Sequence, residues 1–526
     1  MDKAGGNREP GTAARALRRA AFLLILALTA FRLWYGATTG MANDETYYWQ
    51  WSRQLAWGYF DQGPGIAFCI RIGTLIFGDT PLGVRFVPIL LAAATGWLVF
   101  ETASRWLGER IALVSLILLS VAPLLSVGGL LATYDNPQVF CWVAALLALT
   151  VTVQTGRAGG WYVVGLFVGL GALCKLTAWL FAPCVLIFLL LSPAYRPWLR
   201  TPHPYLACAL ALLIYSPCLV WNWQQDFPSV RHAAALSSRS RGAAPLRWFG
   251  DFLGSQAIVL GPLLFLAETG ALFVTGRTAA AGLFGPDGSR REEASRFLLA
   301  FSAPILLLCV VLSLQSKLEA NWPAPAHITG LMAVAAWFDG ILRRGKIGGR
   351  IAVGATAALS CLLVVLLLFP QVLPKVGITV SAELGQKATE TYGWPELMRQ
   401  VQDARRRLEK EGPPVFVAGT NYRVPSLLAF HLPDRPEPVE LFFAARRDHY
   451  YLTVDSRKYI GWNALLCLDS DKPEAVRQAR SCFETVEALP PAEVYREGFT
   501  GPVKRWQLYA CRGFLGYDPA ARIEGW

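Results

Sequence analysis

The chain has 526 residues, of which 54% are hydrophobic and only 16% charged, and its mean hydropathy is +0.37. A soluble globular chain carries about 25% charged residues, so a wholly soluble enzyme, a disordered protein and a fibrous repeat are excluded. The net charge of +12 suits a multispanning membrane protein, whose cytoplasmic loops collect Lys and Arg. The 11 Cys follow no metal-ligand spacing, and most lie within apolar runs.

Apolar runs of about 20 residues predict membrane-spanning helices. They are Leu17–Tyr35, Leu82–Thr102, Ile111–Val127, Pro137–Val153, Tyr205–Val220, Leu253–Val274, Phe297–Leu314, Pro325–Leu342 and Ile351–Phe369. A further stretch, Gly159–Ser192, is interrupted by Lys175 and reads as two short helices that turn at Cys174–Lys175. The total is then about 11 spans. A single tilted helix in this stretch would reverse the sidedness of everything after it.

The distribution of basic residues predicts which loops are cytoplasmic. With a cytoplasmic N-terminus, the inner loops hold Arg105, Arg110, Arg157, Arg196, Arg200, Arg277, Arg290, Arg291, Arg296, Arg343, Arg344, Lys346 and Arg350. The outer loops are then residues 36–81, 128–136, the turn at Lys175, 222–251 and 316–322. The unusual polar residues therefore gather on one face of the membrane.

The sequence becomes polar after Phe369. Residues 371–526 show one amphipathic helix with Trp394, Leu397, Val401 and Leu408, followed by short apolar runs that predict strands at Val415–Ala418, Ala464–Leu468 and Trp506–Tyr509. The chain is thus expected to have a transmembrane domain, 1–370, and a soluble α/β domain, 371–526, which the odd span count makes extracytoplasmic. In an oxidising compartment Cys467 and Cys482 form either a disulfide or two buried free thiols.

Two carboxylates and a lysine in the outer loops are candidates for chemistry. Asp44 and Glu45, followed by aromatic residues, suit a general base near a lipid surface, although Asp44 also suits a helix N-cap. Asp135 precedes Pro137, so a cap explains it as well. Lys175 would either pair with a phosphate or snorkel to the headgroups.

Further polar residues accompany them. A basic patch holds Arg231, His232, Arg239 and Arg241, and the next outer loop carries Lys317, Glu319 and Asn321 beside Trp322. Positive charge on the outer face is disfavoured, so the patch requires an anionic partner such as a lipid or sugar phosphate. The aromatic residues belong to the interfacial belt or, in a pocket, stack on sugar rings.

Several motifs in order resemble a known family. They are Asn43-Asp44-Glu45-Thr46-Tyr47-Tyr48-Trp49, Trp57-Gly58-Tyr59-Phe60-Asp61-Gln62-Gly63-Pro64, Gly78-Asp79 with Gly83-Val84-Arg85, Thr133-Tyr134-Asp135-Asn136-Pro137, Cys174-Lys175, Trp221-Asn222, Glu319-Ala320-Asn321-Trp322-Pro323 and Gly393-Trp394-Pro395-Glu396-Leu397. Together they resemble the bacterial family-39 glycosyltransferases. These polytopic α-helical membrane enzymes of the GT-C class are related to protein O-mannosyltransferases and to the aminoarabinose transferase of lipid A.

The resemblance implies transfer of a sugar from a polyprenyl-phosphate donor on the extracytoplasmic face of the bacterial inner membrane. The acceptor would be lipid A, a polysaccharide, another lipid or a protein. Asp44 matches the presumed catalytic base with Glu45 beside it, Asp135 matches the acid of the second loop, and Lys175 matches the lysine near the donor phosphate. The donor and substrate contacts are expected at Tyr59, Asp61, Gln62, Lys175, Arg231, His232, Lys317, Glu319 and Asn321. Membrane lipids are expected partners and nucleic acid is not.

One motif departs from the family pattern. Where relatives have Asp-His-Pro-Pro or Glu-Lys-Pro-Pro, this chain has Asp61-Gln62-Gly63-Pro64, so a neutral Gln replaces a phosphate-binding cation. The resemblance to the aminoarabinose transferase, in which the acidic residue of this motif takes part in a metal site, implies a possible divalent metal at Asp61. No partner His is assured, so no metal or other cofactor is assigned. The expected reaction is a single displacement that inverts the anomeric centre, with cations for the leaving phosphate and a carboxylate for the acceptor hydroxyl.

Two other functions compete with this interpretation. A transporter or flippase of lipid-linked saccharides would show internal repeats and buried mid-membrane charges, whereas no repeat is evident and the acids within spans are few, Glu268 and Asp339. A scaffold with an outer binding domain would not explain why Asp44, Asp135 and Lys175 all lie in the outer loops.

Overall fold

The computed structural model describes residues 11–238, 245–281, 290–443 and 447–517. It divides into two compact units. The helical unit comprises Met1–Trp34, Phe86–Val220 and Ser237–Val365, and the mixed unit comprises Tyr35–Arg85, Trp221–Leu236 and Leu366–Trp526. Arg239 and Arg241 of the predicted basic patch lie outside the described residues.

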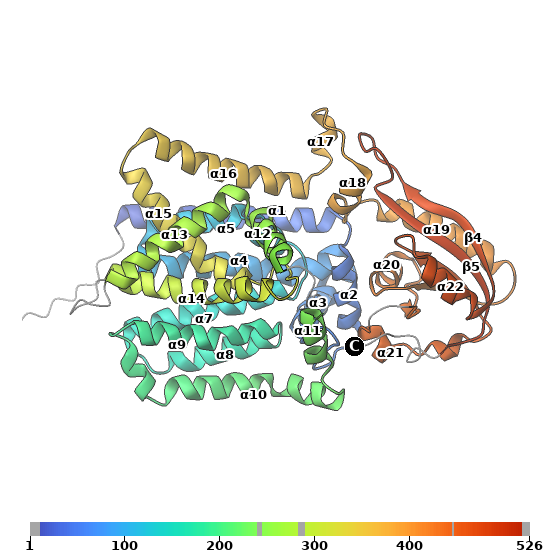
Figure 1. Ribbon diagram of the computed structural model, residues 1–526, viewed down its shortest axis with the longest axis horizontal. Helices are drawn as coiled ribbons and strands as arrows, with labels where there is room; N and C mark the ends of the chain where they lie inside the picture. The colour runs from blue at the N-terminus through green and yellow to red at the C-terminus, as the bar shows by residue number, and fades with distance from the viewer. Residues whose placement is uncertain (1–10, 239–244, 282–289, 444–446, 518–526) are drawn as a thin grey trace, which may run out of the picture. The chain divides into compact units, whose positions relative to one another are not determined.

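Helices, most of them long and apolar, build the helical unit together with a few short turns (Figure 1). They are α1 (Thr12–Thr38), α4 (Pro81–Leu107), α5 (Glu109–Val121), α6 (Pro123–Gly128), α7 (Asp135–Thr155), α8 (Gly160–Ala172), η1 (Leu176–Leu180), α9 (Phe181–Leu191), η2 (Arg196–Arg200), α10 (His203–Gln224), α12 (Pro245–Leu260), α13 (Pro262–Ala281), α14 (Arg290–Ser313), α15 (Ala324–Arg343) and α16 (Ile347–Leu368). Helices α1, α4, α10 and α16 extend into the mixed unit.

Seven of the described helices are long and apolar enough to cross a membrane: α1, α4, α7, α10, α14, α15 and α16. The predicted turn at Cys174–Lys175 is confirmed, because α8 ends at Ala172 and η1 begins at Leu176. The span predicted at Leu253–Val274 is not one straight helix, and as a bent helix pair it is either a broken span or a re-entrant loop. There α12 and α13 meet at a bend of 105°, where Gly261 has φ +91° and Pro262 cannot continue the hydrogen-bond ladder. With these broken and short helices, the total of 11 spans stays a prediction.

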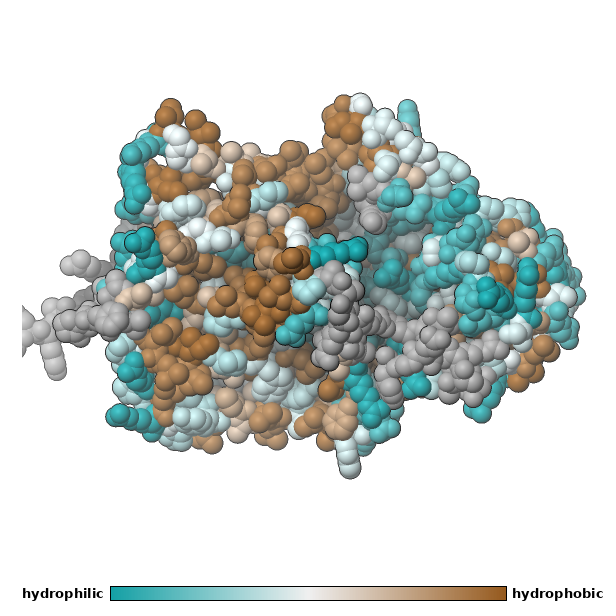
Figure 2. Space-filling view, in the orientation of Figure 1, coloured by the Kyte–Doolittle hydropathy of each residue, from teal (hydrophilic) through white to brown (hydrophobic). Residues whose placement is uncertain are grey.

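Small residues let the helices of this unit approach closely. A Cβ added to Gly165 of α8 would lie 2.4 Å from the carbonyl oxygen of Ala207 on α10, and one added to Gly169 would lie 2.9 Å from that of Ala211. Such contacts drive helix association where lipid surrounds the protein. Figure 2 shows apolar residues over much of the visible surface of the helical unit, as expected for a lipid-facing surface. Leu266 of α13 is one of the exposed large apolar residues of this unit.

The mixed unit contains a five-stranded sheet in the order β2-β1-β3-β5-β4. Its strands are β1 (Val415–Gly419), β2 (Val439–Glu440), β3 (Asn463–Leu468), β4 (Phe483–Val494) and β5 (Lys504–Phe514). Strands β1–β2 and β1–β3 are parallel, and β3–β5 and β4–β5 are antiparallel. The remaining elements are α2 (Asn43–Arg53), α3 (Gly65–Phe77), α11 (Pro228–Ser238), α17 (Val372–Lys375), α18 (Ala382–Ala388), α19 (Trp394–Glu409), α20 (Arg423–His431), α21 (His449–Thr453), η3 (Ser456–Tyr459) and α22 (Pro473–Arg480).

Apolar clusters cover both faces of this sheet. One joins α19 and α20 to Leu465 and Cys467 of β3, and the other joins α22 to the alternate residues of the same strand. Cys482 belongs to the second cluster and Cys467 to the first, so their side chains lie on opposite faces. Both are buried free thiols, and the alternative of a disulfide between them is wrong for this geometric reason.

Candidate functional site

The first turn of α2 positions the two adjacent carboxylates of the mixed unit. The helix begins at Asn43 with Ala42 as its N-cap, and the backbone N–H of Ala42 donates to Oε2 of Glu45 at 2.9 Å. The capping carboxylate is therefore Glu45, at the third helical position, as in a capping box. Asp44 lies within the helix and is not its N-cap, so the capping explanation for Asp44 is wrong.

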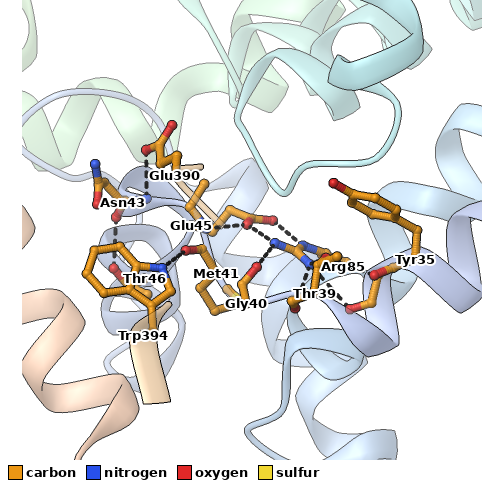
Figure 3. A network of polar contacts seen from close by, with 12 residues as sticks. Tyr35, Thr39, Gly40, Met41, Asn43, Glu45, Thr46, Arg85, Glu390 and Trp394 are labelled. Atoms are coloured by element: carbon orange, nitrogen blue, oxygen red, sulfur yellow. Dashed lines mark hydrogen bonds and ion pairs between the residues drawn. The ribbon is translucent and has the colours of Figure 1, made fainter. Parts of the chain in front are cut away.

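Glu45 is fully buried in an ion pair with Arg85 of α4. Nε of Arg85 donates to Oε1 of Glu45 at 2.7 Å, and Nη2 donates to Oε2 at 2.5 Å. The same guanidinium donates to the carbonyl oxygens of Gly36, Thr39 and Gly40 and to Oγ1 of Thr39 (Figure 3). Such a bidentate pair with additional acceptors leaves no buried charge unsatisfied, and it ties the 36–42 segment to α2 and α4.

The segment also contacts the first residue of α19 and the residues just before that helix. Nε1 of Trp394 donates to the carbonyl oxygen of Met41 at 2.8 Å, and the N–H of Asn43 donates to Oε1 of Glu390 at 3.0 Å (Figure 3). Burial raises the pKa of Glu390 and lowers the pKa of Lys504, whose ammonium lies 4.0 Å from the Trp394 ring, to about 8. The start of α2 is thus rigidly framed.

Asp44 has a different environment from its neighbour. Its side chain is half-buried, and Oδ1 accepts a hydrogen bond of 2.9 Å from the hydroxyl of Tyr422, just before α20. A partly exposed carboxylate that accepts a hydrogen bond from a tyrosine hydroxyl is able to accept a proton from an incoming hydroxyl group.

Asp61 belongs to a second group of polar side chains in this unit. Its Oδ2 accepts from the hydroxyl of Tyr47 at 2.6 Å, and its Oδ1 lies 3.3 Å from Nε2 of His232. The Tyr47 oxygen also accepts from the backbone N–H of His449 at 2.9 Å. Burial, reinforced by the Asp61 carboxylate, raises the pKa of Tyr47 well above its usual value, and burial lowers the pKa of His449 to about 4.

Tyr59, the aromatic residue among the predicted donor contacts, packs inside the mixed unit and supports the loop that follows it. Tyr59 is fully buried and stacks on Trp51 with 4.5 Å between ring centroids, while its hydroxyl donates to the Trp51 carbonyl at 2.8 Å. The N–H of Tyr59 donates to the carbonyl oxygen of Gln62 at 3.0 Å, so the pair closes the loop that carries Asp61. Gln62 itself is half-buried.

The helical unit brings three predicted residues together. Nζ of Lys175 donates to Oδ1 of Asp135 at 2.6 Å, and Nδ2 of Asn321 donates to Oδ2 at 2.6 Å. Lys175 is only 5% exposed, so it does not snorkel into solvent within this structure. Lys317 and Glu319 are exposed, and no ion pair joins either of them to another described residue.

Arg231 is exposed at the start of α11, one residue before the buried His232. Within the described residues, no group of three or more His, Cys, Asp or Glu side chains gathers as a metal site would require. The sequence interpretation assigned no role to Arg85 and overlooked Tyr422. The Gly83-Val84-Arg85 motif contains the former, whereas nothing in the sequence relates Tyr422 to Asp44.

Comparisons with known proteins confirm the resemblance that the motifs indicated. Residues 61–221 match the family described as Dolichyl-phosphate-mannose-protein mannosyltransferase. A lipid A galacturonosyltransferase of Rhizobium johnstonii is 30% identical over 323 residues, which cover 61% of this chain and 65% of that protein. An undecaprenyl phosphate-alpha-4-amino-4-deoxy-L-arabinose arabinosyl transferase of Serratia proteamaculans is 32% identical over 153 residues, covering 25% of this chain and 27% of that protein. This chain therefore spans less than two thirds of the length of either relative.

Solved structures show the same fold. ArnT from Cupriavidus metallidurans in the apo state superposes with a TM-score of 0.60 at 16% identity, covering 96% of this chain and all of that one. The same protein bound to undecaprenyl phosphate gives a TM-score of 0.56 at 17% identity, covering 94% of this chain and 99% of that chain. The chain is thus a multi-pass membrane protein with the ArnT fold, and the predicted fold class, a polytopic helical protein with a C-terminal α/β region, is confirmed.

Proposed function

We propose that this chain, which has the ArnT fold and matches the dolichyl-phosphate-mannose-protein mannosyltransferase family over residues 61–221, is a glycosyltransferase that moves a sugar from a polyprenyl-phosphate donor to lipid A. The relatives support both the donor and the acceptor, because their names specify lipid A in one case and an undecaprenyl-phosphate sugar in the other. The sugar is then a uronic acid or an amino sugar of the same kind.

The contrast between Asp44 and Glu45 is the observation that carries the assignment of the base. The Glu45 carboxylate forms an ion pair with Arg85 and accepts the hydrogen bond that caps α2. We therefore assign it the role of positioning the first turn of α2. Asp44, half-buried and oriented by Tyr422, keeps a carboxylate that can take the proton of an acceptor hydroxyl. The lipid phosphate is already a good leaving group, so the reaction requires this base, cations and alignment, and it inverts the anomeric centre.

The other predicted residues support the substrates in different ways. We assign Lys175 to the donor phosphate, with Asp135 and Asn321 as the groups that orient it. Asp61 and His232 form a polar pair within hydrogen-bonding range that suits the hydroxyl groups of a sugar. Tyr59 and Gln62 shape the loop that carries Asp61. The exposed residues Arg231, Lys317 and Glu319 suit contacts with the polar head of an anionic acceptor.

The enzyme would operate in the bacterial inner membrane. The Lys and Arg distribution supports a cytoplasmic N-terminus and an extracytoplasmic domain at 371–526, so that the transfer takes place on the outer face. Membrane lipids would then surround the helical unit, whose exposed apolar residues suit such a contact.

The test is transfer by the purified full-length protein in detergent. We expect lipid A to gain the mass of one sugar residue when synthetic undecaprenyl phosphate linked to galacturonic acid or to 4-amino-4-deoxy-arabinose is supplied, and the donor to be converted to undecaprenyl phosphate. A well-folded preparation that consumes neither donor would contradict the proposal.

A further inference from the structure

Buried cations in the helical unit are paired, with one exception among the described residues. Lys175 pairs with Asp135 at 2.6 Å and Arg296 with Glu293 at 2.5 Å. Arg32, in the C-terminal part of α1, is 9% exposed. No described carboxylate, hydroxyl or carbonyl oxygen forms a hydrogen bond or ion pair with it. A largely buried charge without a counter-charge is costly, so an anion from outside the protein would stabilise it.

The guanidinium of Arg32 lies against the loop that leads to α7. A Cβ added to Gly129 would lie 3.1 Å from Nη2 of Arg32, so the glycine makes room for the arginine head. The neighbouring carbonyl oxygen of Gly128 accepts from Nδ2 of Asn136 at 3.0 Å. Asn136 directly follows Asp135 in α7. Arg32 therefore adjoins the same short loop whose far end carries the Asp135–Lys175 pair.

The start of α7 carries further polar atoms that lack partners. Oδ1 of Asn136 and both amide atoms of Gln138 are buried without a hydrogen bond among the described residues, and Gln138 is only 1% exposed. Gln138 lies three residues after Asp135 and hence on the same side of the helix. Buried polar groups of this kind are normally satisfied, which indicates that a polar ligand group completes this end of the unit.

Charge balance identifies the chemistry of that ligand. Lys175 shares its positive charge with the Asp135 carboxylate. Arg32 is the largely buried arginine of the described helical unit that has no carboxylate beside it. Guanidinium groups match phosphate oxygens in a bidentate geometry. At the end of an apolar helix, a phosphate on a lipid chain is the natural anion.

We infer that Arg32 binds the phosphate group of a membrane lipid, and, on the basis of the proposed function, that this lipid is the polyprenyl-phosphate donor. Asn136 and Gln138 supply neutral hydrogen-bonding groups beside it. Arg32 is then a binding residue in addition to Lys175.

The experiment measures binding of undecaprenyl phosphate, without a sugar, to the full-length protein in phosphatidylcholine nanodiscs. We expect Arg32→Gln to raise the Kd by about 10-fold or more. Arg32→Lys should raise it by less, because lysine keeps the positive charge but loses the bidentate geometry of the guanidinium group. Arg19→Gln on the same helix, where the side chain is exposed, is the matched control and should leave the Kd unchanged. An unchanged Kd in Arg32→Gln would overturn the inference.

Further measurements distinguish a polyprenyl phosphate from another anionic phospholipid, and distinguish failure of this inference from failure of the proposed function. Displacement of the probe by phosphatidylglycerol with equal affinity, in an Arg32-dependent manner, would retain the phosphate site but contradict its assignment to the donor. If Arg32→Gln does not fold, an unchanged Kd in the folded Arg32→Lys variant contradicts the bidentate contact. Arg32-dependent binding without sugar transfer by the wild type would contradict the proposed function alone, whereas transfer with Arg32-independent binding would contradict this inference alone.

Discussion

Asp44 and Glu45 are neighbours in the sequence, yet the fold gives their carboxylates different surroundings. Consecutive helical residues point about 100° apart, so one side chain turns toward Arg85 and the other toward Tyr422. The sequence motif predicts that a pair of acids matters but not which of the two is held in a buried ion pair with an arginine. That distinction depends on Arg85 and Tyr422, which lie 40 and 378 positions away from their partners.

Replacement of Asp44 tests the catalytic base. Asp44→Asn keeps the size of the side chain and its contact with Tyr422 but removes the proton acceptor, so we expect a folded protein whose transfer rate falls by about 100-fold or more. Initial rates of lipid A glycosylation at saturating donor measure the effect. Tyr422→Phe removes only the orienting hydrogen bond and should reduce the rate less. Normal transfer by a well-expressed Asp44→Asn protein would rule out this base.

Lys175 tests the requirement for a cation near the donor. In Lys175→Ala the Asp135 carboxylate keeps Asn321 but loses its counter-charge, and the loss of a hydrogen bond to a charged group costs about 1.5–3 kcal/mol. We expect donor use to fall on the order of 100-fold, whereas Lys175→Arg retains much more. Donor titrations of kcat/KM give the comparison. Near-normal turnover by the alanine variant would show that the lysine has no role in catalysis.

At the scale of elements, the capping of α2 is a tertiary feature rather than a local one. The local pattern suggests Asp44 as the cap, but Glu45 fills this role because Arg85 holds its carboxylate at Ala42. Strand β4 was also not predicted. It contains Leu489-Pro490-Pro491, and a proline pair argues against a strand, but the register with β5 shifts between Leu489 and Ala492 and accommodates it.

The Glu45–Arg85 pair should be required for the stability of this region. Both side chains are fully buried, and removing one partner of such a pair costs about 3–5 kcal/mol because the other charge stays buried. We expect Glu45→Gln and Arg85→Met to lower the thermal midpoint and to expose residues 36–42 to protease. The matched control is Arg457→Gln, which breaks an exposed, solvent-screened pair with Asp455 and should leave the thermal midpoint unchanged. Equal stability of the two sets would contradict a structural role for the pair.

At the scale of the whole molecule, hydropathy and charge predicted the helical membrane protein and its C-terminal α/β region, because apolar length is a strong constraint in lipid. They did not predict that residues 35–85 and 221–236 group with the C-terminal region in one compact unit. The reason is that the grouping depends on buried polar contacts such as Trp394 with Met41. Hydrogen bonds between distant loops leave no periodic signal in the sequence.

The orientation of the chain is the remaining prediction at this scale. If the basic loops are cytoplasmic, Lys346→Cys should react with a membrane-impermeant maleimide only after the cells are opened, whereas Ser470→Cys should react in cells with a permeable outer membrane. Both positions are exposed. The native exposed thiols Cys208 and Cys361 are first replaced by Ser to remove background labelling. Labelling of Lys346→Cys and protection of Ser470→Cys in unopened cells would place the C-terminal domain in the cytoplasm. Such an orientation would also make an even number of spans necessary, because the N-terminus would remain on the side that the Arg-rich start of α1 favours.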